Sequence, residues 1–202
     1  MKFFILSGSH RREAQTLKVA NYIRGVLASG APPAAVHLYS LSGNPLPLWD
    51  EDAGGAPDEL WDPIAAELKS ADALVVVTPE WGGMVTPGVK NFLLNCTFAE
   101  IGHKPGLIVT VSASRGGSYP VAELRMSGTK NNRLNWIPEH VIVQHAERNL
   151  NLPDGSPGLE KEDQLIRARL HYALRVLAEY GKALQAVRAS GVIDHQTFRS
   201  GM

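Results

Sequence analysis

The stretch Phe3-Phe4-Ile5-Leu6-Ser7-Gly8-Ser9-His10-Arg11-Arg12 near the N-terminus joins an uninterrupted apolar run to a small polar turn. Apolar residues at helical spacing follow at once, from Leu17 to Leu27. This order is typical of a buried parallel strand that leads directly into a helix. Gly8 allows the backbone to fold back between the two without a side-chain clash. The stretch therefore predicts the first strand–turn–helix unit of a parallel sheet.

The same turn gathers groups that bind anions. Hydroxyls at Ser7, Ser9 and Thr16 lie beside the free backbone N–H groups expected at the helix start, and Arg11 and Arg12 add positive charge. The chain contains neither Gly-x-Gly-x-x-Gly nor Gly-x-x-x-x-Gly-Lys-Ser/Thr, which disfavours dinucleotide Rossmann sites and P-loop sites. The turn suits the single phosphate of a mononucleotide; the alternative is an ordinary capped helix with two solvated arginines.

Composition narrows the class of protein. A chain of 202 residues forms one well-buried domain, which removes about 70% of the unfolded surface from water. Its 20 basic and 20 acidic side chains leave no cationic excess, which disfavours nucleic-acid and membrane-surface binding. The single cysteine, Cys96, allows no internal disulfide and favours a reducing compartment. Because no apolar run approaches signal-peptide or transmembrane length, we expect a soluble cytoplasmic protein.

Apolar runs and helical patterns alternate along the chain. Strands are predicted at residues 3–6, 34–38, 73–77, 107–111 and 140–143. Helices are predicted after the first turn up to Gly30, at 58–70, from about Pro87, around 121–125, and from 160 to about 189, with a surface loop at 40–57. This alternation predicts an α/β fold with helices on both faces of a parallel sheet. We expect one domain at 1–190 and a C-terminal tail at 191–202.

Three of the predicted strands end in segments rich in Gly, Ser and Pro. These segments are residues 7–12, 78–83 and 112–117. Ligands of such sheets bind beyond the carboxyl ends of the strands, where the strand order reverses. We therefore expect the three segments to converge on one site.

Together the three segments resemble the NADPH-dependent FMN reductase family, a flavodoxin-like group of quinone, azo-dye and chromate reductases. Gly8-Ser9-His10-Arg11 follows the family's Gly-Ser-x-Arg loop around the flavin phosphate. Thr78-Pro79-Glu80-Trp81-Gly82-Gly83, with Lys90-Asn91, is similar to Thr-Pro-Glu-Tyr-Asn before Leu-Lys-Asn. Ser112-Ala113-Ser114-Arg115-Gly116-Gly117, with Leu124-Arg125, is similar to Ser-x-Gly-x-x-Gly-Gly and Leu-Arg. The resemblance implies a flavodoxin-like three-layer sandwich whose five-stranded parallel sheet has the order 2-1-3-4-5.

The chain departs from the family pattern at a few positions. Ala14 stands where serine is common, so one phosphate hydroxyl is missing. Trp81-Gly82 replaces Tyr-Asn, which keeps the aromatic ring and removes a side-chain amide. Pro87 lies one position later than usual, and Ser114 stands at the usual position of a glycine. None of these changes removes a backbone N–H donor.

The resemblance also assigns residues to FMN. It implies phosphate binding through charge-assisted hydrogen bonds by Ser9, Arg11, Gln15 and Thr16. It implies contact with the edge of the isoalloxazine ring by Pro79, Glu80, Trp81, Gly82 and Gly83, whose backbone amides would stabilise the reduced flavin. The resemblance also implies that four residues line the other side of the ring: Ser112, Ser114, Gly116 and Gly117. Glu80 has the alternative role of a surface acid, and Trp81 that of a core or interface aromatic.

The implied activity is that of an FMN-dependent NAD(P)H oxidoreductase. Hydride would pass from NADPH or NADH to noncovalently bound FMN and on to a second small-molecule acceptor. Because the flavin carries the chemistry, no catalytic side chain is expected. The histidines lack metal-ligand spacing, so no metal is expected. Arg125, Lys130 and Arg133 would contact a dinucleotide phosphate, a subunit partner or solvent.

Two alternatives belong to other classes. In a serine hydrolase, Ser114 would be the nucleophile of a Ser-x-Ser-x-Gly elbow. Its histidine would be His140, His145 or His171, and its acid Glu123 or Glu139. The second alternative is an electron carrier that binds FMN without oxidising NAD(P)H. Whether the flavoprotein is a reductase or an electron carrier, we expect a homodimer or homotetramer. Its contact surface would be supplied by Leu48, Trp49, Phe92 and Phe98.

Overall fold

A computed structural model describes residues 1–201. The strands are β1 (Lys2–Ser7), β2 (Ala35–Ser40), β3 (Ala73–Trp81), β4 (Met84–Val85), β5 (Pro105–Val111) and β6 (Asn135–Val143). Five of them form a parallel sheet in the order β2-β1-β3-β5-β6, while β4 pairs antiparallel with the end of β3. Counted along the chain, the parallel strands have the predicted order 2-1-3-4-5.

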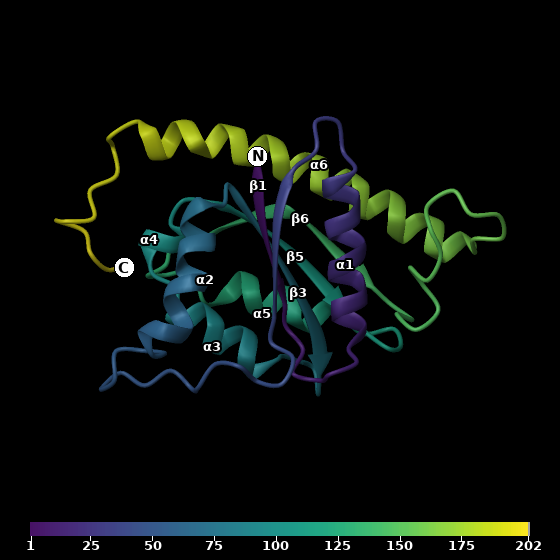
Figure 1. Cartoon of the computed structure of the whole chain (residues 1–202), viewed down its shortest axis with the longest axis horizontal. Helices are drawn as coiled ribbons and strands as arrows, with labels where there is room; N and C mark the ends of the chain where they lie inside the picture. Colours follow the sequence, from purple (N-terminus) through teal and green to yellow (C-terminus); the bar gives the residue numbers. More distant parts are fainter. Residues whose placement is uncertain (202) are drawn as a thin grey trace.

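Helices cover both faces of the sheet (Figure 1). One face carries α1 (Gln15–Ala28) and α6 (Lys161–Ala189), and the other carries α2 (Asp58–Ser70), α3 (Pro87–Asn95), α4 (Phe98–Ile101) and α5 (Ser118–Met126). Alternation along β1 shows why two cores form. Phe3 and Ile5 pack toward α1 and α6, whereas Phe4 and Leu6 pack toward α2 and α3. The predicted flavodoxin-like three-layer sandwich is confirmed.

Two strands, β3 and β6, extend four and five residues beyond their predicted limits. β3 continues past Val77 to Trp81 and forms a hairpin with the unpredicted β4, so residues 78–81 are strand instead of loop. Pro79 does not end the strand. It lies close to the end of β3, where it still pairs with Val111 of β5. β6 begins at Asn135 instead of His140, with a register shift opposite Gly106–Ile108. The short helix α4 was also not predicted.

Phe92 was expected to offer apolar surface, and this expectation is wrong. Its side chain is 1% exposed and lies among three other aromatic rings. The ring centroids lie 5.9 Å from Phe4, 6.0 Å from Tyr39 and 5.5 Å from Trp61. Phe92 therefore belongs to the core between α2, α3 and the sheet.

The segment after α6 turns back toward α4 (Figure 1). The ring of His195 stacks on Phe98, with centroids 3.9 Å apart. Arg133 Nη2 donates a hydrogen bond to the carbonyl oxygen of Phe198. Residues 191–201 thus contact the body of the protein. Over the described residues, none of the helices has both the length and the apolarity that a bilayer crossing requires.

Candidate active site

The segments predicted to bind a ligand follow three adjacent strands at one edge of the sheet. The predicted segments 7–12, 78–83 and 112–117 fall on the β1–α1 loop (residues 8–14), on the end of β3 with its hairpin to β4 (residues 80–85), and on the β5–α5 loop (residues 112–117). The strand order reverses between β1 and β3, because the chain leaves β1 toward β2 and returns to β3 on the other side. The predicted convergence therefore falls at the topological switch point of the sheet.

Hydrogen bonds clamp the β1–α1 loop to β3 and α3. Gly8 N donates to the carbonyl oxygen of Val77 at 2.7 Å, and Thr86 Oγ1 donates to the carbonyl oxygen of Gly8 at 2.6 Å. A Cβ atom on Gly8 would lie 2.3 Å from Val89 Cγ2. Only glycine allows this close approach, which fixes the start of the loop against α3.

The N-terminus of α1 leaves donors free. Its N-cap residue, Ala14, makes no side-chain capping hydrogen bond, and the first turn contains no acidic residue. Thr16 Oγ1 and Gln15 Oε1 are buried and have no hydrogen-bond partner. Ser9 is 2% exposed, and its hydroxyl accepts a hydrogen bond from Arg11 N at 3.3 Å. The exposed Arg11 completes a site whose unpaired hydroxyl, uncapped helix and positive charge suit a phosphate.

His10 was not among the predicted site residues, although it packs against both the start of α3 and the hairpin. A Cβ atom on Gly88 would lie 1.9 Å from His10 Nε2, so the imidazole packs directly against the first turn of α3. Its ring meets Trp81 edge to face, with centroids 5.7 Å apart. His10 Nε2 is buried without a partner. His10 therefore joins the β1–α1 loop to the hairpin.

The β3–β4 hairpin turns at Gly82 and Gly83, whose φ angles are 59° and 77°. Two consecutive residues with positive φ between paired strands match the tight hairpin turn that favours Gly-Gly. At the base of the hairpin, Gly117 N donates to Glu80 Oε2 at 2.5 Å. This interaction uses one oxygen of the carboxylate that the sequence assigned to the flavin. Glu80 thus ties the hairpin to the β5–α5 loop.

The β5–α5 loop rests on the segment that follows β6. Ala146 N donates to the carbonyl oxygen of Ser112 and His145 N to that of Ser114, both at 3.0 Å. The side chain of Gln144 donates to the carbonyl oxygens of Arg115 and Gly116. Gly117, with φ 114°, is the N-cap residue immediately before α5. These contacts hold Ser112, Ser114, Gly116 and Gly117 in one loop at the same edge as the β1–α1 loop.

Three further residues that hold these loops in position were not predicted to do so: Thr86, Glu123 and Gln144. Glu123 Oε2 accepts a hydrogen bond from Val85 N at 2.7 Å and Glu123 Oε1 pairs with Lys90. These interactions lower the pKa of Glu123 despite the opposing effect of burial. The Gly82-Gly83 pair was an available signal for the hairpin, whereas nothing local to Glu123 or Gln144 indicates their partners.

The geometry does not assemble the alternative hydrolase site. Within residues 1–201, no hydrogen bond links the hydroxyl of Ser114 to a histidine. Glu123, one of its two proposed acids, is occupied by Val85 and Lys90. The left-handed residue of the loop is Gly117 and not Ser114, so the serine does not occupy the strained turn of a nucleophile elbow.

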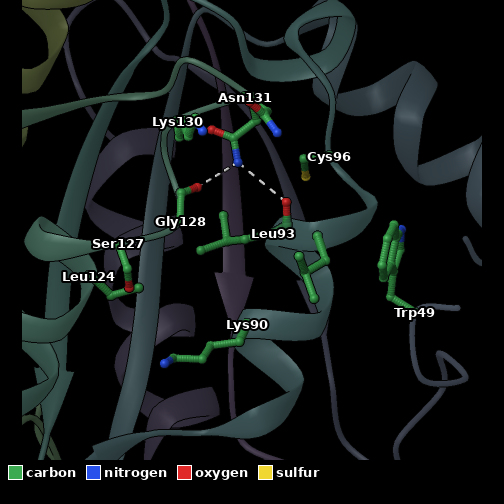
Figure 2. A pocket seen from close by; sticks show the side chains of 11 residues that line it. Trp49, Lys90, Leu93, Cys96, Leu124, Ser127, Gly128, Lys130 and Asn131 are labelled. Carbon is green, nitrogen blue, oxygen red and sulfur yellow. Dashed lines mark hydrogen bonds between the residues drawn. The ribbon is translucent and has the colours of Figure 1, made fainter. Parts of the chain in front are cut away.

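The basic residues considered for a dinucleotide phosphate are dispersed. Arg125 donates to the carbonyl oxygens of Ile137 and Pro138, and Arg133 donates to that of Phe198. Lys130 borders a cavity of about 420 Å³ beside α3 (Figure 2). These three side chains do not form a common site.

The cavity in Figure 2 lies outside the three loops. Asn132 Nδ2 fixes one wall by donating to the carbonyl oxygens of Leu93 and Gly128. Trp49 and Leu94 line it as well. Cys96 also contributes to the lining, and burial raises the pKa of its thiol, so this cysteine is not an activated nucleophile. Among the described residues, no cluster of three or more His, Cys, Asp or Glu side chains could hold a metal ion.

Known proteins share both the sequence pattern and the fold. The sequence model of the family described as NADPH-dependent FMN reductase matches residues 1–148. An NADPH azoreductase from Bacillus sp. (strain OY1-2) is 25% identical over 188 residues, covering 93% of this chain and 97% of the relative. An FMN-dependent NADH:quinone oxidoreductase from Aromatoleum aromaticum is 33% identical over 144 residues, covering 59% of this chain and 72% of the relative.

A solved structure agrees with the fold. The flavoenzyme NAD(P)H:(acceptor) oxidoreductase FerB from Paracoccus denitrificans superposes with a TM-score of 0.70 and 19% identity. The superposition covers 90% of this chain and 97% of FerB. At this identity the likeness concerns the arrangement of the helices and strands.

Proposed function

The chain belongs to the NADPH-dependent FMN reductase family, and we propose that it binds FMN at the β1–α1 loop, the β3–β4 hairpin and the β5–α5 loop. It would then reduce a small quinone or azo compound at the expense of NADPH or NADH. The observation that supports this most directly is the uncapped N-terminus of α1. There Thr16 Oγ1 has no partner and Arg11 is exposed, at the switch point of the sheet.

The proposed phosphate end of the site consists of Ser9, Arg11, Gln15 and Thr16. Backbone N–H groups at the start of α1 and the guanidinium of Arg11 favour a doubly negative group. Ser9 already positions Arg11 through the hydrogen bond from Arg11 N. These residues would bind and orient the phosphate, and the missing hydroxyl at Ala14 leaves the backbone donors in place.

The proposed ring end consists of the hairpin and the β5–α5 loop. The chemistry that bound FMN supplies is acceptance of a hydride from the nicotinamide and release of electrons to the acceptor. Pro79, Glu80, Trp81, Gly82 and Gly83 would support one edge of the ring. The opposite side would be lined by Ser112, Ser114, Gly116 and Gly117. Because Glu80 holds Gly117, the two walls keep a fixed spacing.

We further place the protein in the cytoplasm as a homodimer or homotetramer. The cytoplasm supplies nicotinamide cofactors and keeps Cys96 reduced. Leu94, which lines the cavity in Figure 2, is 57% exposed. Leu48 and Met126 each precede in the sequence a residue that lines the cavity, and their exposed fractions are 79% and 82%. Exposed apolar side chains of this kind favour association between copies. In light scattering, Leu94→Glu should yield monomers, whereas Leu165→Glu on the outer side of α6 should not.

The decisive experiment titrates FMN into the protein and follows the visible spectrum. Arg11→Ala should weaken FMN binding about 10- to 100-fold, since it removes a charged hydrogen-bond donor. Arg12→Ala is the matched control and should change affinity less than about threefold. Anaerobic NADPH should bleach the bound flavin within one turnover. A flavin that binds and is not reduced would instead indicate an electron carrier.

A further inference from the structure

A second cavity, of about 400 Å³, lies at the amino edge of the sheet. His103 and Lys104 immediately precede β5, whereas the proposed FMN loop follows β5. The seven residues of β5 separate the two by roughly 20 Å. The cavity is therefore distinct from the proposed active site.

The lining of this cavity is strongly basic. Five cationic or titratable nitrogen groups border it: Lys69, His103, Lys104, Arg188 and His195. They come from the end of α2, the residues before β5, the end of α6 and the C-terminal segment. In the part of the chain that the structure describes, none of the residues that line it is acidic. We call this feature the basic cavity.

The nearby acids are engaged elsewhere. Glu100 accepts hydrogen bonds from Thr97 and pairs with Lys69 at 3.3 Å. Asp72 accepts hydrogen bonds from Lys2 N and Gln185, and Asp194 accepts hydrogen bonds from the backbone N–H groups of Gln196 and Thr197. Within residues 1–201, Lys69 is thus the only one of the five lining groups that has a carboxylate partner.

Backbone carbonyls hold the cations in place instead. Lys104 Nζ donates to the carbonyl oxygens of Leu68 and Lys69 at 2.6 and 2.8 Å, and Arg188 Nη1 donates to that of His103 at 3.0 Å. Lys104 is only 5% exposed. Burial lowers the pKa of Lys104 to about 8, with a further contribution from Arg188, and the charges of Asp72 and Glu100 oppose this shift only in part. A buried cation that no carboxylate pairs with directly is costly, so the cavity favours an anion.

Unpartnered nitrogen atoms point to the same ligand chemistry. His103 Nε2 and His195 Nδ1 are both buried and make no hydrogen bond. The ring centroids of the two histidines lie 5.7 Å apart. Burial lowers the pKa of His103, and the charges of His195, Arg133 and Arg188 lower it further. Two imidazoles, an arginine and a lysine together can donate the hydrogen bonds that the oxygens of a tetrahedral oxyanion accept.

We propose that the basic cavity binds a phosphate-type oxyanion, either inorganic phosphate or the phosphate group of a small monoester. The anion supplies the negative charge that the described lining lacks. Because His195 belongs to the C-terminal segment and stacks on Phe98, binding also fastens that segment to α4. The site works independently of the flavin.

The test uses the full chain as purified, dialysed free of phosphate and of unbound flavin. Inorganic phosphate is titrated at constant ionic strength while the histidine ring signals are followed by NMR. A saturable shift with a dissociation constant of about 1 mM or tighter is expected. The pKa of His103 should rise on binding, since the anion stabilises the imidazolium. Adenosine monophosphate in a parallel titration separates the two sources, because tighter binding than phosphate identifies a monoester as the ligand.

Three variants make the proposal falsifiable. Arg188→Gln should weaken phosphate binding about tenfold or more. Lys182→Gln, an exposed lysine on the same helix, should leave it unchanged. His195→Ala tests the same site from the exposed C-terminal segment, where a folding defect is not expected. The proposal would be overturned if the NMR shifts did not saturate up to about 20 mM phosphate. It would also be overturned if Arg188→Gln and Lys182→Gln lost phosphate affinity equally.

Discussion

The two proposed anion sites lie at opposite ends of the sheet and position their donors by different means. At the carboxyl ends of β1, β3 and β5, the proposed donors are backbone N–H groups and small hydroxyls, together with the exposed Arg11, and contacts such as that between Thr86 Oγ1 and Gly8 fix the loop that carries them. At the amino end of β5, the donors are long side chains such as Lys104, fixed by backbone carbonyls. Backbone donors do not titrate, and a side chain added beside them, as at Gly8, displaces the loop. Side-chain donors such as Lys104 and His103 change their protonation with pH.

The substitution Gly8→Ala tests most strongly whether the loop at the carboxyl ends of the strands tolerates added bulk. The added Cβ would meet Val89 Cγ2 at 2.3 Å and the carbonyl oxygen of Val77 at 3.0 Å, so the β1–α1 loop must move. We expect the free energy of unfolding to fall by about 1–3 kcal/mol and FMN binding to be lost. Urea unfolding and flavin titration measure the two effects.

Gly25→Ala is the matched control, since nothing lies within 4 Å of the added atom. In the interior of α1 this change should stabilise the protein by up to about 1 kcal/mol. Normal FMN binding by Gly8→Ala would show that the close approach of the loop to α3 is not needed.

A smaller effect is expected at the base of the hairpin. Glu80→Ala removes the acceptor of the hydrogen bond from Gly117 N and should reduce FMN affinity about tenfold. Glu80→Gln keeps an acceptor and should recover most of the affinity. Equal losses in both variants would point instead to a direct role of the carboxylate charge toward the ligand.

The pH response tests the amino end. The pKa of Lys104 is about 8 in the folded protein, below its ordinary value of 10.5, so between these values the unfolded chain binds more protons. Stability should therefore rise with pH across this window, by about 1 kcal/mol per pH unit, and fall as pH drops toward 8. Urea unfolding of Lys104→Met should lack this slope. The same slope in both proteins would assign the pH response to other groups.

The smallest expected effect concerns Ser114→Ala. Ser114 is exposed, and its backbone N–H donates to Ser112 Oγ at 3.2 Å. Because the variant keeps that backbone donor, FMN affinity should change less than about threefold. An esterase assay should find no serine-dependent activity. Loss of measurable ester hydrolysis in the variant would favour the hydrolase alternative.

Local patterns predicted most of the fold. The helix at 58–70 has the predicted limits, because its apolar spacing is regular and a proline precedes it. β3 was predicted too short, since Pro79 and the small residues beyond it resemble a loop. The sequence alone could not indicate that Val111 pairs with Pro79 and extends the strand.

The sequence predicted which loops lie together in the candidate site, and it did not predict the contacts that fix them. Gly8, Arg11 and Gly117 follow from a strand–turn–helix pattern and a family resemblance. The partners that fix them are distant in the chain: Thr86 lies 78 residues from Gly8, and Glu80 lies 37 residues from Gly117. Such pairings depend on strand order and register, which local patterns do not contain.

The construction of the β3–β4 hairpin restricts how this protein can diverge. Its base is anchored by Glu80 and Glu123, whereas little surrounds its tip, where an added Cβ on Gly82 would meet only the end of Met84, at 3.7 Å. The φ of 59° at Gly82 admits asparagine or aspartate far more readily than other side chains. One substitution at Gly82 would therefore bring an amide or a carboxylate to the edge of the proposed flavin site, whereas the anchored base of the hairpin admits no such change without loss of its hydrogen bonds.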